Sequence, residues 1–92
     1  MAEVIWTRAA LLRLRSIRAY IAQFNPNAAE RIAERLWNAG ESLKQFSERG
    51  RPADDVRREL VIVPPYIIRY RVEKDRVFIL GIRHGAQRPE RG

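Results

Sequence analysis

The carboxy-terminal third of the chain sets the strongest limit on its fold. It holds three short runs rich in β-branched and aromatic residues, at 60–63, 66–72 and 76–82. Short runs of this composition, separated by two-residue breaks at Pro64-Pro65 and Lys74-Asp75, predict consecutive antiparallel hairpins. Lys74-Asp75 lacks the glycine that a two-residue turn prefers, so the register at this turn stays open. We therefore predict a three-stranded meander.

Register decides which side chains share a face of this sheet. Two-residue turns would pair Tyr70 with Ile79, Ile68 with Val61, and Val72 with Val77, and paired side chains point to the same face. We expect the nearly uncharged face to be core: Val61, Val63, Tyr66, Ile68, Tyr70, Val72, Val77 and Ile79. The opposite face would be an apolar strip with a basic fringe: Arg58, Leu60, Ile62, Ile67, Arg69, Arg71, Phe78, Leu80, Ile82 and His84. A bulge at Gly81 would move Ile82 and His84 to the first face.

Two helices are predicted before the meander. Apolar residues recur at three-four spacing from Arg8 to Phe24, on the stripe Ala10, Leu14, Ile17, Ile21 and Phe24, and Thr7 is a natural N-cap for this helix. A second helix is expected from about Ala28 to Phe46, with a capping-box-like pair of Asn27 and Glu30. Its expected buried stripe is Ala29, Ile32, Ala33, Leu36, Gly40 and Leu43. Gly40 either permits close helix–helix approach or is simply tolerated, at about 1 kcal/mol relative to alanine.

These elements together predict an α+β fold. The short connection Asn25-Pro26-Asn27 forces the helices antiparallel. A short strand is expected at residues 3–7, and residues 47–55 read as a loop because Gly50 and Pro52 interrupt them. The order is β-α-α-β-β-β, a two-layer arrangement with a helical hairpin packed on a small, mainly antiparallel sheet.

Length and composition bound the class of protein. Residues 1–92 are enough for one domain and one core, and residues 85–92 are expected to form a flexible tail. The absence of cysteine excludes disulfides and thiolate metal sites and suits a reducing cytoplasm. The start lacks a signal-peptide pattern, and the longest apolar run, residues 60–68, is too short to span a membrane. We expect a cytoplasmic protein without a membrane partner.

The formal charge of +7 comes almost entirely from arginine. It favours an anionic partner, either a nucleic acid or an acidic protein segment, although arginine-rich codon usage would give the same composition. Location favours a partner, because six arginines fall on or beside the predicted sheet: Arg57, Arg58, Arg69, Arg71, Arg76 and Arg83. No predicted helix is both strongly basic and free to enter a groove, which disfavours direct DNA binding.

The residues available for catalysis are few. His84 is the only histidine, and the chain has neither a glycine-rich phosphate loop nor a cysteine, so no metal or cofactor is expected. Metal-free RNA cleavage needs a base, an acid and cations around the phosphorane, which His84 with Arg69, Arg71 and Arg83 could supply in part. Alternatively His84 only ends the last strand, and the arginines neutralise Glu59 and Glu73. The residues alone favour the second interpretation.

A series of short motifs resembles the toxins of the RelE/ParE superfamily, the toxic halves of bacterial type II toxin–antitoxin modules. The resemblance covers nearly the whole chain in order. It runs through IWTRAALLRLRSIRAYIAQFNPNAAERIAERL, the GRP loop, REL at 58–60, PYIIRYRV at 65–72 and VFILGIRHGAQ at 77–87. Each motif alone is weak, but their order and spacing together are specific.

The resemblance also bears on the target. RelE-type toxins are described as ribosome-dependent mRNA endonucleases. They usually have an arginine three residues before the strand tyrosine and a catalytic tyrosine or histidine–tyrosine near the C-terminus. Here the first position is Ile67, and no tyrosine follows Tyr70. The ending at residues 82–86 looks more like the ParE branch, which poisons DNA gyrase without being an enzyme. Because Arg69 and Arg71 could replace the missing arginine, the mRNA endonuclease remains the alternative, with the ribosome and mRNA as its partners.

The resemblance further implies a cognate antitoxin. Such antitoxins bind operator DNA through their N-terminal part and wrap the toxin with their C-terminal segment, so the toxin meets DNA only indirectly. A basic domain with an apolar strip suits an acidic peptide that folds on contact. The expected antitoxin-binding residues are Leu11, Leu14, Ile67, Arg69, Phe78 and Leu80. The expected target-binding residues are Arg58, Arg69, Arg71, Arg83 and His84.

Overall fold

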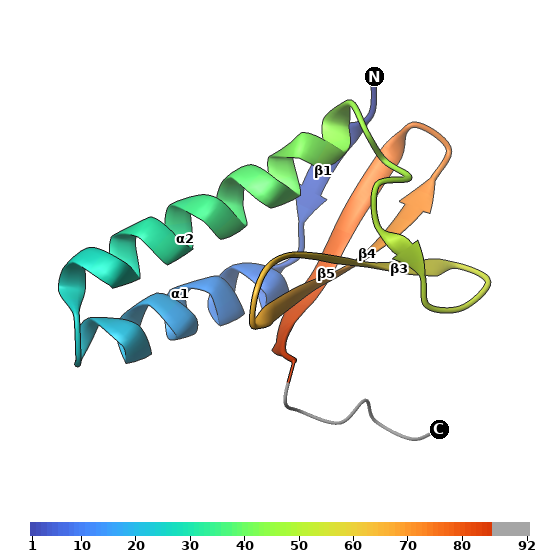
Figure 1. Cartoon of the computed structure of the whole chain (residues 1–92). Coiled ribbons are helices and arrows are strands. Elements are labelled where there is room, and N and C mark those ends of the chain that lie inside the picture. The colour runs from blue at the N-terminus through green and yellow to red at the C-terminus, as the bar shows by residue number, and fades with distance from the viewer. Residues whose placement is uncertain (86–92) are drawn as a thin grey trace.

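The computed structural model describes residues 1–85 of the chain, and it confirms the two-layer α+β architecture (Figure 1). An antiparallel helical hairpin covers one face of a five-stranded sheet, and no helix of residues 1–85 covers the other face, which we call the open face (Figure 1). The elements are β1 (Glu3–Trp6), α1 (Arg8–Ala22), α2 (Pro26–Glu41), a 3-10 turn η1 (Ser42–Lys44), β2 (Arg51–Pro52), β3 (Arg57–Val63), β4 (Tyr66–Glu73) and β5 (Arg76–His84).

The predicted meander forms the centre of the sheet. The strand order is β1-β5-β4-β3-β2, with β1 parallel to β5 and the other pairs antiparallel. Strand β2 was not predicted, because two exposed residues inside a loop carry no hydrophobic alternation. The turn between β4 and β5 is the expected two-residue one, and Lys74 takes the left-handed conformation there with φ 53°.

The helix termini differ in part from the predicted ones. Thr7 caps α1 as expected, its Oγ1 accepting a hydrogen bond from the Ala10 N–H at 3.2 Å. The predicted Asn27–Glu30 cap is wrong. Since α2 begins at Pro26, Asn25 is the capping residue, and its Oδ1 accepts from the Ala28 N–H at 3.0 Å. Helix α1 ends before Phe24, which is therefore exposed rather than core, and α2 gives way to η1 instead of reaching Phe46.

The register of the sheet confirms two of the three predicted pairs. Tyr70 pairs with Ile79 and Val72 with Val77, but Ile68 pairs with Leu60 instead of Val61. The reason is an irregularity of β3 between Leu60 and Val63. It turns Leu60 into the core and leaves Val61 43% exposed, the reverse of the predicted faces.

The bulge that the sequence left open at Gly81 is present beside this residue. Arg69 pairs with Gly81 and Tyr70 with Ile79, so Leu80 is the extra residue of β5. Beyond the bulge Ile82 lies opposite Ile68 and is buried, as expected if it changes face. The core between the sheet and the helices consists of Ala10, Ile17, Leu36, Ala39, Leu43, Leu60, Val63, Ile68, Tyr70, Val77, Ile79 and Ile82.

The expected flexible tail at 85–92 lies, except for Gly85, outside the described residues. Within residues 1–85, no helix is both long enough and apolar enough to cross a membrane.

Gly40 lies where α2 closely approaches the sheet. A Cβ atom at this position would overlap the Trp6 indole and lie 2.8 Å from Ile79 Cδ1. The glycine therefore permits close approach of a helix to strands β1 and β5, not the helix–helix approach considered from the sequence.

Gly40→Ala is expected to destabilise the fold. Better helix propensity would contribute about 1 kcal/mol of stability, but overpacking against Trp6 costs about 1–3 kcal/mol. Thermal unfolding followed by circular dichroism should show a lower Tm for Gly40→Ala. In a Trp6→Leu background the overlap with the indole is removed and only the Ile79 Cδ1 methyl group must shift, so the same substitution should cost less there. A higher Tm in the wild-type background would contradict this packing.

Candidate functional site

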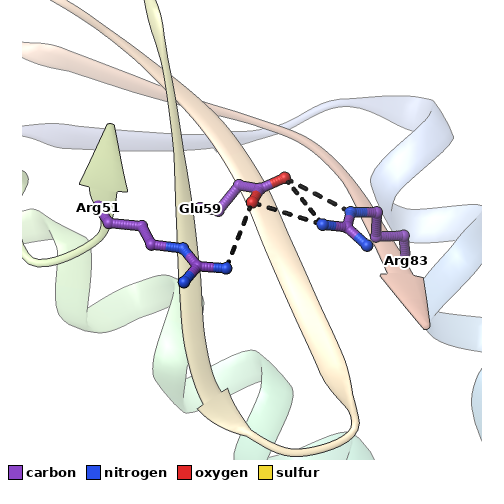
Figure 2. Close-up of polar contacts among 3 residues, drawn as sticks. All are labelled: Arg51, Glu59 and Arg83. Atoms are coloured by element: carbon purple, nitrogen blue, oxygen red, sulfur yellow. Dashed lines mark hydrogen bonds and ion pairs between the residues drawn. The ribbon is translucent and has the colours of Figure 1, made fainter. Parts of the chain in front are cut away.

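The open face of the sheet carries an ion cluster that joins three strands. Glu59 of β3 lies between Arg51 of β2 and Arg83 of β5 (Figure 2). The Arg83 Nη2 and Nε atoms donate to Glu59 Oε2 at 3.3 and 3.4 Å, and Arg51 Nη2 lies 3.9 Å from Glu59 Oε1. The Arg83 and Glu59 side chains are only 17% and 15% exposed. One carboxylate thus holds two guanidinium groups over the middle of the open face.

One further arginine of this face lies on β4, the strand between β3 and β5. Arg69 of β4 is the cross-strand partner of Glu59 on one side and of Gly81 on the other. Arg69 is half-buried and forms no hydrogen bond or ion pair within residues 1–85. Its guanidinium therefore remains available to an external anion.

Arg71 lies further along β4 on the same face. Its Nη2 atom lies 2.7 Å from Glu73 Oε2, and its guanidinium carbon lies 4.9 Å from the centroid of the Phe78 ring. The sequence had suggested that the arginines neutralise Glu59 and Glu73, and the ion pairs of Arg83 and Arg71 confirm it. Arg71 Nε is buried without a hydrogen-bond partner among the described residues.

His84 does not share this face. It pairs with Tyr66 across β4 and β5, whereas Arg83 pairs with Ile67, and successive side chains of a strand point to opposite faces. The imidazole packs edge-on against the Tyr66 ring, with 5.6 Å between centroids. Tyr66 packs against the helix-covered core. The sheet therefore lies between His84 and the three arginines with which it was grouped as a possible ribonuclease site.

Arg58 was expected on the open face, and this expectation is wrong. Because Arg58 pairs with Tyr70, it faces the helix layer, where its Nη1 atom donates to the Gly50 carbonyl at 2.6 Å and to the Glu48 carbonyl at 3.3 Å. The shift of register that buries Leu60 also places Arg58 there. Arg58 holds the loop that leads into β2, and its contacts give it a structural role.

Tyr70 holds the same loop from the core. Its hydroxyl accepts a hydrogen bond from the Gly50 N–H and donates one to the Ser47 carbonyl, both at 2.8 Å. Burial raises the pKa of Tyr70, so the hydroxyl stays protonated and keeps its donor at neutral pH. Because Arg51 follows Gly50 directly, these contacts also position the β2 arm of the ion cluster.

The expected antitoxin-binding residues fall on different surfaces. Leu11 of α1 is 39% exposed, whereas Leu14 is half-buried against the core. Phe78 and Leu80 are half-buried, with Phe78 under the Arg71 guanidinium. Ile67 lies on the expected face of the sheet, opposite Arg83, but it is only 6% exposed, so the expected exposure is wrong. Ile67→Asp would therefore bury a carboxylate and disturb folding, so it is not a clean test of binding.

Residues 1–85 contain no group of three or more His, Cys, Asp or Glu side chains that could hold a metal ion. A surface hollow of about 660 Å³ is lined by residues 45–49. None of the expected site residues lines it, so it does not identify the functional surface.

Sequence reasoning missed three features of this site. It did not identify Arg51 or Glu59 as members of an ion cluster, and it did not identify Gly81 as a position with open space above it. Arg51 was assigned to a loop, and Glu59 was considered only as a counter-charge. The available signal was the placing of charged residues on neighbouring strands, where Glu59 lies two residues after Arg57 and opposite both Arg51 and Arg69. This signal could be used only by knowing that β2 exists and how β3 pairs with its neighbours.

Comparison with known proteins identifies the family of the chain. Residues 4–89 match the family described as "ParE toxin of type II toxin-antitoxin system, parDE". "Toxin RelE2" of Caulobacter vibrioides is 54% identical over 95% of this chain and 99% of its own length. "Putative toxin Y4kP" of Sinorhizobium fredii is 42% identical over 92% of this chain and 90% of its own length.

A solved structure shares the fold. It is titled "Chromosomal ParDE TA system from P. aeruginosa", and it matches with a TM-score of 0.79 and 22% identity over 91% of this chain and 96% of its own. The family match over nearly the whole chain, the two full-length relatives and the shared fold agree with one another. The chain belongs to the ParE toxin family, within the RelE/ParE superfamily of type II toxin–antitoxin systems.

Proposed function

We propose that this toxin acts by binding and inhibiting DNA gyrase, that it does not itself cleave RNA, and that a cognate antitoxin neutralises it. The observation that carries the proposal is the position of His84. General acid–base catalysis needs the titrating group and the cations to converge on one phosphate, within hydrogen-bond reach of the reacting atoms. His84 faces the Tyr66 side of the sheet, while Arg69, Arg71 and Arg83 face the other side.

The arginines fit a binding surface better than a catalytic site. Arg83 is paired with Glu59 and Arg71 with Glu73, so two of the three cations already have carboxylate partners. Such a mixed, partly neutralised surface suits recognition of another protein, where charge sets orientation and specificity. We therefore assign target binding to Arg69, Arg71 and Arg83 on the open face, with His84 beside the end of β5.

The antitoxin is expected to use other parts of the chain as well. Leu11, Leu14, Phe78 and Leu80 offer apolar contacts, and the net charge of +7 favours an acidic segment. We propose that the antitoxin's C-terminal segment covers these residues together with Arg69. In this proposal the toxin meets operator DNA only through its antitoxin.

A ribosome-dependent mRNA endonuclease is the second candidate. One observation favours it: the relative that is 54% identical over nearly the whole chain carries the name "Toxin RelE2". Under this alternative Arg69, Arg71 and Arg83 would stabilise the phosphorane, and His84 would have to reach it around the end of β5.

The experiment that separates the two uses His84→Gln. Glutamine keeps size and hydrogen bonding but cannot titrate, so a binding surface should tolerate it and growth inhibition without antitoxin should be undiminished. An enzyme using His84 as acid or base would lose about 10²–10⁴-fold in rate. Transcripts should be mapped in the same cells, and purified wild-type protein should be added to gyrase supercoiling and to in vitro translation. The control is Arg35→Gln, because Arg35 is a solvent-exposed residue of α2.

Inhibition of supercoiling, with intact transcripts and a toxic His84→Gln variant, would support the proposal. Cleavage of transcripts by wild type, lost in His84→Gln, would overturn it in favour of the mRNA endonuclease.

A further inference from the structure

The connection between the two helices carries an exposed aromatic pair. Tyr20, in the last turn of α1, is 62% exposed, and Phe24, in the connection itself, is 73% exposed. The two rings meet edge to face, with 5.4 Å between their centroids. This end of the helical hairpin lies away from the strands (Figure 1), and neither ring belongs to the core. We call residues 19–27 the hairpin tip.

The hairpin tip is uncharged, although the chain is strongly basic. Residues 19–29 contain no Asp, Glu, Lys, Arg or His, and they form the longest uncharged stretch of a sequence in which 32% of the residues are charged. The two charges that border this stretch cancel, because Arg18 and Glu30 form an ion pair. The exposed polar side chains beside the rings are amides: Gln23, Asn25 and Asn27. Aromatic residues without charge, within a polar rim, are the composition of a protein–protein contact.

The backbone of the connection holds the two rings in place. The N–H groups of Phe24 and Asn25 donate to the Ile21 carbonyl at 3.0 and 2.9 Å, and the Gln23 N–H donates to the Tyr20 carbonyl at 3.3 Å. Asn25 also caps the following helix. Aromatic side chains on a hydrogen-bonded turn have little freedom to lose on binding. Exposed aromatic residues held in this way are suited to carry much of the binding energy of an interface.

We propose that the hairpin tip is a second contact surface for the target of the toxin, and that Tyr20 and Phe24 enter an uncharged apolar pocket of that protein. The inference rests on the proposed function, in which the toxin acts by binding a protein. Charge complementarity selects the occupant. An acidic antitoxin segment finds no cation at the tip, whereas an uncharged pocket meets no unpaired charge there.

A lipid surface and a second copy of the chain fit the tip less well. Three exposed amides would leave water on entering a bilayer, where an unsatisfied amide is costly. A stable dimer uses about 20–30 residues of each partner, far more than the tip offers, and two chains of charge +7 repel each other. A target protein can add contacts to the arginines of the open face, so a small apolar surface is sufficient for it.

The test compares Tyr20→Gln and Phe24→Gln with Leu12→Gln, a control on α1 outside the tip whose side chain is 50% exposed. Glutamine removes the apolar group, adds no charge and is a good helix former. The protein concentration that half-inhibits supercoiling by purified gyrase holoenzyme should rise about tenfold or more in each tip variant. It should stay at the wild-type value in Leu12→Gln and in Phe24→Trp, which keeps an aromatic ring.

Circular dichroism melts show whether each variant folds, and Phe24→Gln decides if Tyr20→Gln does not, because Phe24 lies outside both helices. Folded tip variants that inhibit gyrase like wild type, or a Leu12→Gln variant as weak as they are, would overturn the proposal. Two further measurements test the other occupants. Binding of wild type to vesicles of phosphatidylglycerol and phosphatidylcholine that the tip variants lose, or a wild-type dimer in sedimentation velocity that they lose, would each show that the proposal is wrong.

Growth inhibition without antitoxin separates this proposal from the identity of the target. A wild-type chain that is toxic but leaves supercoiling unchanged would refute gyrase as the target. If the tip variants also lose that toxicity and Leu12→Gln keeps it, the tip stands as the surface for a different target. Tip variants that remain fully toxic and inhibit gyrase would give the reverse result, a correct target and a wrong contact surface.

Discussion

Replacing Tyr70 with alanine is expected to remove a large part of the free energy of unfolding, about 3–5 kcal/mol. Tyr70 is fully buried, at 0% exposure, in the centre of β4. Truncation of a buried aromatic residue costs about 3–5 kcal/mol, and the whole free energy of unfolding of such a domain is typically about 5–15 kcal/mol. The variant also loses both hydrogen bonds that hold the loop before β2.

The measurement is denaturant unfolding followed by circular dichroism. Tyr20→Ala is the matched control, because Tyr20 is 62% exposed on α1 and its loss should change stability little. Tyr70→Phe separates the hydroxyl from the ring: it leaves the Gly50 N–H and the Ser47 carbonyl without their partner, at roughly 1–3 kcal/mol. A Tyr70→Ala variant as stable as Tyr20→Ala would mean that the core is wrongly placed.

The sequence was sufficient for the architecture because hydrophobic periodicity and turn chemistry are local signals. The three-four spacing in α1 and the two-residue turn at Lys74-Asp75 both depend on neighbours in the chain. The pairs Tyr70–Ile79 and Val72–Val77 follow from that turn and were predicted. The glycine in β5 also gave a local reason to expect a bulge.

The errors occurred where register depends on tertiary packing. The irregularity of β3 between Leu60 and Val63 has no local marker, since every residue from 60 to 63 is apolar and fits either face. That single shift misplaced Leu60, Val61 and Arg58 together, as expected when a strand slips by one residue. The same dependence on strand pairing limited the prediction of the site. Arg51 could not be placed on the open face before β2 was known.

Arg83→Glu is expected to abolish growth inhibition and to weaken the fold. The substitution places a second carboxylate beside Glu59, in a position where Arg83 is now only 17% exposed. Loss of its charged hydrogen bonds should lower the free energy of unfolding by roughly 1–3 kcal/mol. Arg35→Glu on the exposed face of α2 is the control for a change of net charge, and it should remain toxic.

Loss of growth inhibition or loss of stability in Arg83→Glu would not by itself define the role of Arg83, because a misfolded toxin is also inactive. Exchanging the pair, with Glu59→Arg and Arg83→Glu in one chain, removes the ambiguity by restoring opposite charges between β3 and β5. We expect the exchange to recover part of the lost stability in urea melts, as a double-mutant cycle reports for coupled neighbours, although the new arginine on β3 would lie beside Arg51. Growth inhibition should stay lost, because a target that needs a cation on β5 would find a carboxylate there. Recovery of toxicity together with stability would show that Arg83 only holds the sheet, and it would remove Arg83 from the target-binding surface.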